Sequence, residues 1–161
     1  MLRRIALLLG LCPAPALAEG LFDPATGGAV CFVRHYSAEH LAGHPQQQVT
    51  RIGVVLDRSQ AESDPVLRLE FGLRPGQRRA VAMAYCLPDG LNFDCDVEGD
   101  AGNFRIEPGK GGALRLSVGA RGIGLEDDQG FVTLAADRGD DRVFLIPPQD
   151  GMACAGFSGA G

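Results

Sequence analysis

The sequence predicts an all-β domain, an antiparallel meander that closes into a small barrel or sandwich. Apolar or alternating runs of strand length follow one another along the chain, at intervals of about 8 to 12 residues. Turns that contain glycine separate these runs, such as Pro88-Asp89-Gly90. No segment between the runs is long enough for the crossover helices of a parallel sheet. These three observations together favour a sheet built from hairpins.

The expected strands begin at Val30 and end at Ile146. They are residues 30–36, 49–56, 65–73, 80–86, 91–97, 103–106, 113–118, 122–125, 131–135 and 142–146. Alternation is clearest in Val66–Phe71 and Ala113–Val118, where apolar side chains share one face and Arg, Glu or Ser take the other. One face of the sheet is therefore expected to contact solvent.

The chain has room for at most one short helix, near residues 37–44. Ser37 is a favourable N-cap residue, and with His40 three positions later it supplies half of a capping box. Gly43 weakens the helix and Pro45 ends it. We expect a helical turn or short helix that links the first two strands.

The first eighteen residues have the features of a cleavable signal peptide. Arg3 and Arg4 form a charged start, residues 5–11 an apolar run, and residues 16–18 a small-residue cleavage site. The mature protein is then periplasmic or secreted. Lipidation at Cys12 is the alternative, but Leu11 stands where lipoprotein signals usually carry Gly or Ala.

The remaining chain is expected to form one domain. Residues 19–29 are predicted to be a flexible lead-in, residues 30–155 a single disulfide-bonded β domain, and residues 156–161 a flexible tail. Removal of the signal cuts the basic residues from 15 to 13 against 20 acidic residues, a formal charge of −7 in place of −5. This charge disfavours nucleic acid as a partner, and the apolar run is too short for stable membrane insertion.

Signal removal also leaves an even number of cysteines, which suits an oxidising compartment: Cys31, Cys86, Cys95 and Cys154. Cys86 and Cys95 flank a turn and are expected at facing positions of one hairpin. Cys31 would then pair with Cys154 and join the two ends of the domain. Four cysteines allow three connectivities, so this pairing depends on the hairpin alone.

All three histidines, His35, His40 and His44, fall within ten residues. On a helix His40 and His44 lie one turn apart on one face, a spacing that lets two imidazoles share a zinc or copper ion. His35 or Glu39 could supply a further ligand. The other interpretation is a solvated turn between two strands, which needs no cofactor.

No catalytic residue is assigned, and the protein is not expected to be an enzyme. Ser158 lies in Gly156-Phe157-Ser158-Gly159, which is not the spacing of a nucleophile elbow. Asp94 to Asp100 places acidic residues as the start of an EF-hand does, but the twelfth position is Arg105 where the loop requires Glu.

The opening of the predicted domain carries one recognisable pattern. After Cys31 it reads Tyr36-x-x-x-His40-Leu41-x-x-His44-Pro45. This resembles the opening of small secreted bacterial proteins of unassigned function, and the likeness extends to residues 141–144 and to Cys154. The resemblance implies a secreted, disulfide-bonded β domain. In size, export signal and disulfide use the chain is also similar to small periplasmic β-barrels that inhibit lysozyme.

Two functional hypotheses follow. The first is a non-enzymatic domain of the cell envelope that binds a macromolecular partner or a small ligand, in the manner of an inhibitor. Its acidic surface favours a basic partner such as lysozyme. The second is divalent metal binding through His35, His40 and His44.

Overall fold

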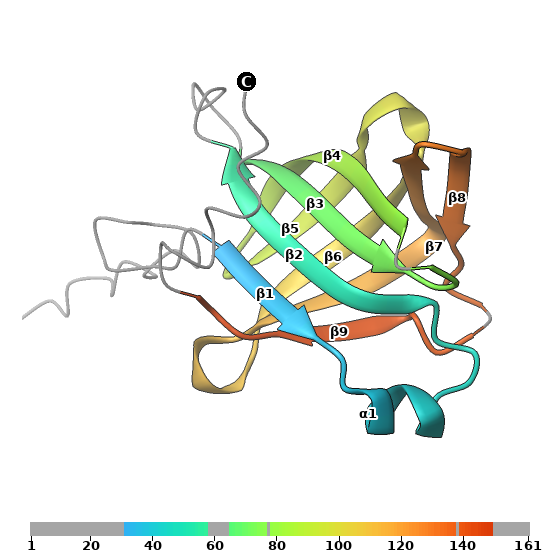
Figure 1. The fold of residues 1–161 in the computed structure, drawn as a ribbon. Helices are drawn as coiled ribbons and strands as arrows, with labels where there is room; N and C mark the ends of the chain where they lie inside the picture. Colours follow the sequence, from blue (N-terminus) through green and yellow to red (C-terminus); the bar gives the residue numbers. More distant parts are fainter. Residues whose placement is uncertain (1–30, 58–64, 77, 138, 150–161) are drawn as a thin grey trace, which may run out of the picture.

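The computed structural model describes residues 31–57, 65–76, 78–137 and 139–149, and it confirms an all-β fold (Figure 1). Nine strands and one short α-helix form the described part of the chain. The strands are β1 (Cys31–His35), β2 (Val49–Asp57), β3 (Val66–Leu73), β4 (Arg78–Asp89), β5 (Asn92–Val97), β6 (Gly102–Pro108), β7 (Leu114–Asp127), β8 (Gly130–Leu134) and β9 (Val143–Ile146). The helix is α1 (Ala38–Gly43), and two 3₁₀ turns are η3 (Glu98–Asp100) and η4 (Lys110–Gly112).

The strands form an antiparallel meander that closes into a barrel. Consecutive strands pair in order from β1 to β8. The second half of β7 returns to β4, where Val81 pairs with Glu126, and this contact closes β4 to β7 into a ring. β9 pairs with the first half of β7, and the residues after β9 reach β1, where the Val33 N–H donates to the Pro147 carbonyl at 3.1 Å. The sheet therefore curls round on itself, as Figure 1 shows.

Period-two alternation fills the interior of the barrel. Leu67, Leu69 and Phe71 of β3 all point inward and are fully buried. Phenylalanines come to this core from four strands that are distant in sequence: Phe32, Phe71, Phe104 and Phe144. The edge-to-face contact of Phe71 with Phe144, at 6.2 Å between ring centroids, joins β3 to β9. One continuous apolar core thus holds the early and late strands together.

The prediction of two separate strands at 113–118 and 122–125 was wrong. The structure has one continuous strand, β7, across both runs. Its register against β6 jumps from Val118 to Ile123, so four residues of β7 face Asn103. The glycines in this segment make a bulge that bends the strand without ending it. As a result, the first half of β7 pairs with β9 and the second half with β8.

Close backbone approach explains why glycine stands in this bulge. Gly122 has φ +75°, in the left-handed region that favours glycine. A Cβ at Gly119 would lie 2.5 Å from the Asn103 side chain, whose Oδ1 accepts a hydrogen bond from the Arg121 N–H at 3.2 Å. The glycines that suggested the end of a strand therefore allow the strand to bend.

The short helix and one disulfide are confirmed. Ser37 caps α1, since its Oγ accepts a hydrogen bond from the His40 N–H at 3.1 Å. Cys86 and Cys95 are directly opposed in β4 and β5 and form a disulfide that is buried in the core. Such a bond fits an oxidising compartment. Among the described residues, no helix has the length and apolarity to cross a membrane.

Several predicted features lie outside the described residues: the signal peptide, Cys12, the lead-in 19–29, the tail 156–161, Ser158 and Cys154. Cys31 is fully buried at the start of β1. Its pairing with Cys154 stays a prediction.

Candidate functional site

A pocket of about 400 Å³ opens on the outer face of the barrel, between α1 and strands β1 to β4. We call it the α1 pocket. Its lining residues are His35, Tyr36, Ala38, Leu41, Thr50, Arg51, Glu70, Phe71, Gly72 and Arg79. The volume lies within the range of small-molecule sites, roughly 300 to 1,000 Å³.

A buried carboxylate lies in this pocket. The Glu70 side chain is 4% exposed and receives one guanidinium from each neighbouring strand. Arg51 Nη1 on β2 donates to Oε1 at 3.1 Å, and Arg79 Nη2 on β4 donates to Oε2 at 2.6 Å. The hydrogen bond to Glu70 raises the pKa of Arg79. Both carboxylate oxygens are therefore engaged, which offsets the cost of burying the charge.

The register of four strands creates a hollow beside this carboxylate. His35, Arg51, Gly72 and Arg79 are successive partners across β1, β2, β3 and β4. Gly72 lies between the two arginines and has no side chain to fill the position. A Cβ there would lie 3.0 Å from Thr50 Oγ1, so the space is closely bounded. The two arginines thus flank a position at which the surface of the sheet carries no side chain.

Stacked rings form one wall of the pocket and continue away from it. The Arg34 guanidinium lies 4.7 Å from the Tyr36 ring, which stacks on His40 at 4.8 Å. His40 in turn stacks on His44 at 4.3 Å. Burial raises the pKa of Tyr36, although the charge of Arg34 opposes this shift. This column holds the Tyr36 ring in a fixed orientation.

The predicted metal ligands occupy different surroundings. His35 lines the α1 pocket, whereas Glu39 is exposed in the first turn of α1. His40 Nε2 lies 3.0 Å from Gln47 Oε1, and His44 Nδ1 lies 3.9 Å from Asp140 Oδ2.

Stacking is a poor arrangement for chelation. Imidazole lone pairs lie in the ring plane, so rings inclined by only 24° do not direct two nitrogens at one ion. In the part of the chain that the structure describes, no group of three or more His, Cys, Asp or Glu side chains is placed to hold a metal. Zinc or copper binding by this cluster stays a prediction.

Two charged residues fix the loop that carries α1 back to the sheet. Asp141 accepts hydrogen bonds from the Gln48 N–H at 2.5 Å and the Val49 N–H at 3.2 Å. Burial raises the pKa of Asp141, and these two amides oppose the shift. On the other side of the loop, Arg74 Nε donates to the Gln47 carbonyl at 2.5 Å and Nη2 to the His44 carbonyl at 2.8 Å. The loop therefore holds α1 against the pocket.

A second surface lies at the far end of β4. Tyr85 and Leu87 project from the outer face and are 46% and 59% exposed, and Leu91 in the following turn is 57% exposed. Asp96 and Asp94 of β5 are their register partners. We call this set, together with Asp89, the hairpin surface: Tyr85, Leu87, Asp89, Leu91, Asp94 and Asp96.

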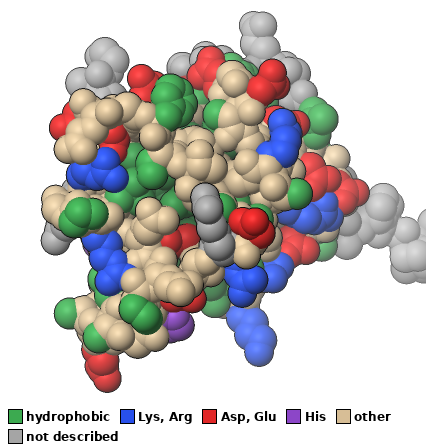
Figure 2. Space-filling model, turned by 90° about the vertical axis from the view of Figure 1, so that its right-hand side faces the viewer, with side chains coloured by type: hydrophobic (Ala, Val, Ile, Leu, Met, Phe, Trp, Pro, Cys, Tyr) green, Lys and Arg blue, Asp and Glu red, His purple; other side chains and the backbone are tan. Residues whose placement is uncertain are grey.

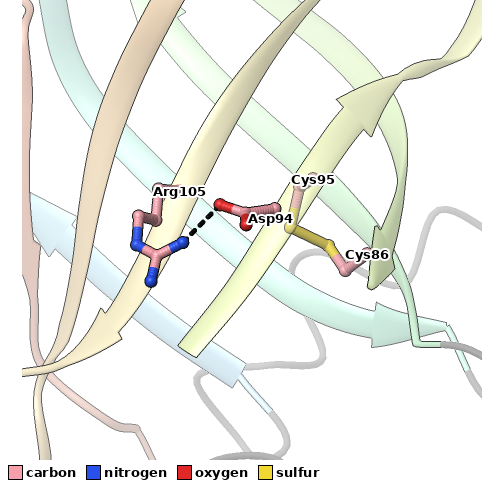
Figure 3. Close-up of a disulfide and its surroundings, with 4 residues drawn as sticks. All are labelled: Cys86, Asp94, Cys95 and Arg105. Carbon is pink, nitrogen blue, oxygen red and sulfur yellow. Dashed lines mark hydrogen bonds and ion pairs between the residues drawn. A yellow bond between two sulfur atoms is a disulfide. The ribbon is translucent and has the colours of Figure 1, made fainter. Parts of the chain in front are cut away.

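Arginines from β6 and β7 pair with the acidic residues of the hairpin surface. Arg105 donates to Asp89 and Asp94, both at 2.6 Å, and these bonds raise its pKa. Figure 3 shows Asp94 directed at Arg105, beside the Cys86–Cys95 disulfide. Arg121 pairs with Asp96. The carboxylates that resemble a calcium loop in sequence are thus held by guanidinium groups.

The charges of the two signs are interspersed elsewhere as well. Figure 2 shows the side of the molecule that carries α1 and the β3–β4 and β7–β8 turns, where Lys and Arg side chains lie next to Asp and Glu side chains. Arg78 at the start of β4 also pairs with Asp127 at the end of β7, at 2.8 Å.

Comparison of the chain with family models, with curated proteins and with solved structures finds no match. The fold and its surfaces therefore define the class: an antiparallel β-barrel that carries a buried disulfide and two candidate binding surfaces.

Sequence reasoning missed the residues at the centre of the α1 pocket. Glu70 was expected on the solvent face, and it does lie on the outer face, but it is buried there. The alternation of apolar and polar residues in β3 predicted that the Glu70 side chain points outward. Its burial depends on Arg51 and Arg79, which reach it only through the register of β2, β3 and β4.

Proposed function

We propose that this protein is a non-enzymatic binding domain of the cell envelope that recognises a basic protein partner through the hairpin surface. The observation that carries the proposal is the exposure of Tyr85 and Leu87 beside Asp94 and Asp96, on one face of a disulfide-linked hairpin.

Interfaces of this kind need apolar anchors. Fully buried interface centres are rich in aromatic and apolar side chains, and a few such residues supply most of the binding energy. Tyr85 and Leu87 are two residues apart on β4, so they point the same way and can enter one contact together. Leu91 extends the apolar area at the turn.

The hairpin is also preorganised. The buried Cys86–Cys95 bond links β4 to β5 directly behind the exposed residues. A surface that is already ordered loses little conformational entropy when it binds. Binding therefore does not have to order the two arms of the hairpin.

Charge favours a basic partner. Acidic residues outnumber basic ones in the chain, 20 to 15, and three of them belong to the hairpin surface. An acidic rim around apolar anchors steers a positively charged protein toward the contact. A basic partner can also replace Arg105 at the exposed carboxylates, since exposed ion pairs exchange at little cost.

The test uses lysozyme as the basic probe, because the sequence resembles periplasmic β-barrels that inhibit lysozyme in its size, predicted export signal and disulfide use. Calorimetric titration at low salt is expected to show a complex with a dissociation constant of about 1 μM or tighter. Leu87→Asp and Tyr85→Ser should each weaken it about tenfold or more, since each removes an anchor that the complex would bury.

The matched control is Leu145→Asp, which changes an exposed leucine on β9. It should leave the affinity unchanged. The proposal fails if lysozyme does not bind, or if the control weakens binding as much as Leu87→Asp does.

A further inference from the structure

We propose that the α1 pocket binds a small organic anion, with its carboxylate or phosphate group held between Arg51 and Arg79 and its apolar part against the wall formed by α1 and Tyr36. This site is distinct from the hairpin surface and adds a ligand to the proposed protein partner.

The charge of the pocket selects an anion. Two guanidiniums and one carboxylate line it, so positive charge is in excess. Glu70 accepts from both arginines and thereby fixes their guanidinium groups beside its carboxylate. The Arg79 side chain is 54% exposed, and a guanidinium carries five N–H donors in a planar fork that suits oxyanions. Donors on Arg79 are therefore accessible from the pocket.

The space for the anion is the part of the pocket over Gly72, which adds no side chain to it. Arg51 and Arg79 are its direct neighbours on the two adjacent strands, and neighbouring strands lie about 4.8 Å apart. An oxyanion placed over Gly72 can thus accept from both sides. A side chain at this position would crowd its neighbours, because a Cβ there would lie 3.0 Å from Thr50 Oγ1 and 3.3 Å from Arg51 Cβ.

The remaining walls suit an apolar group of limited size. Ala38 and Leu41 of α1 line the pocket together with Tyr36. The Tyr36 ring is held by its contacts with Arg34 and His40, so this wall is formed before any ligand arrives. A cation has no comparable site, since both Glu70 oxygens already accept from arginines.

The pocket and the hairpin surface lie at opposite ends of β4. Arg79 and Leu87 are eight residues apart on this strand, about 26 Å at the rise of a β-strand. If no protein binds at the hairpin surface, the proposal of an anion site is therefore unaffected. If no anion binds in the α1 pocket, the proposal of a protein partner is equally unaffected.

The experiment is a titration of the ¹⁵N-labelled full chain, followed by NMR, with three ligands that share a phenyl ring. Benzoate and phenyl phosphate carry the two oxyanions, and benzamidine is the matched cation. At low salt we expect at least one anion to bind with a dissociation constant of about 1 mM or tighter, with shifts at Gly72 and Arg79. The stronger of the two anions identifies which oxyanion the site prefers.

Two variants test the geometry. Arg79→Gln removes one guanidinium and should weaken anion binding about tenfold, the effect of losing a charge-assisted hydrogen bond. Gly72→Ala keeps every charge but places a methyl group between the arginines, and it should weaken binding at least as much. The control Arg115→Gln removes an arginine of similar exposure that pairs with Glu107 on another part of the barrel, and it should leave binding unchanged.

Each contrary result overturns the proposal. The proposal is wrong if neither anion binds at a concentration 10-fold above the expected dissociation constant. It is also wrong if benzamidine binds as tightly as the anions. If Arg115→Gln weakens anion binding as much as Arg79→Gln does, the binding reflects general charge attraction. If Arg79→Gln and Gly72→Ala both leave the affinity unchanged, the anion binds elsewhere. Thermal unfolding of each variant checks that the fold is retained.

Discussion

The α1 pocket and the hairpin surface use the same chemistry, arginine against carboxylate, on the outside of the same barrel. Glu70 is 4% exposed in the pocket, whereas Asp94 of the hairpin surface is 61% exposed. Each carboxylate has an arginine within about 3 Å. The difference in burial shows that the geometry of an ion pair alone does not determine how much the pair contributes to stability.

The physical reason is solvation. A buried carboxylate that loses its partners stays desolvated and uncompensated, so the pair must persist. An exposed carboxylate regains water when its partner leaves, and its ion pair contributes little to stability. The pocket therefore has a fixed frame, while the charges of the hairpin surface remain available to a partner.

The largest expected effect removes the bond behind the hairpin surface. Cys86→Ala with Cys95→Ala should lower the free energy of unfolding by about 3 kcal/mol, because the disulfide limits the entropy of the unfolded chain and its sulfurs fill the core. Urea denaturation measures this loss. A decrease below about 1 kcal/mol would mean that strand pairing alone holds the hairpin.

Glu70→Gln tests the frame of the pocket directly. The amide cannot pair with both guanidiniums, and one arginine is left partly buried beside it. We expect a loss of about 2 kcal/mol in urea denaturation, less than for a fully buried pair because both arginines retain some contact with water. The matched change Asp94→Asn on the hairpin surface should give no resolvable loss. Equal losses at the two sites would remove the distinction between them.

The pH dependence of stability sharpens the comparison at Asp141, the carboxylate that anchors the loop beside the pocket. Burial raises the pKa of Asp141, so the folded state holds this proton more tightly than the unfolded chain does. The stabilising contribution of Asp141 is complete below its pKa in the unfolded chain, about 3.9. It is lost as the pH rises through the pKa of Asp141 in the folded state.

Asp141→Asn removes this titration. The stability of the wild type relative to this variant should therefore decrease from pH 3 to pH 7 in urea denaturation. The opposite trend would show that the Gln48 and Val49 amides hold the pKa of the carboxyl below its ordinary value.

The smallest effect is expected at Arg105, which pairs with Asp89 and Asp94 on the hairpin surface. Arg105→Ala should leave the thermal midpoint unchanged at physiological salt, since both of its pairs face water. A clear decrease in the midpoint would show that these ion pairs support the hairpin and are not free to exchange.

Local patterns in the sequence predicted most of the strands, the helix at residues 37–44 and the Cys86–Cys95 bond. Each of these depends on residues that are near one another in the chain. The continuity of β7 was missed, because Gly119 and Gly122 carry the same signal whether the chain turns or bulges. A bulge differs from a turn here only in the shift of the β6–β7 register at Asn103, which the structure shows.

By itself, the sequence determined the all-β class and the face on which each side chain lies, because the period of two is a property of the local backbone. The tertiary structure decided which outward residues meet. Arg51 and Arg79 reach Glu70 from strands on either side, and Gly72 places no side chain between them. A shift of one residue in either register would turn these side chains to the other face, and register is set by the packing of the whole barrel.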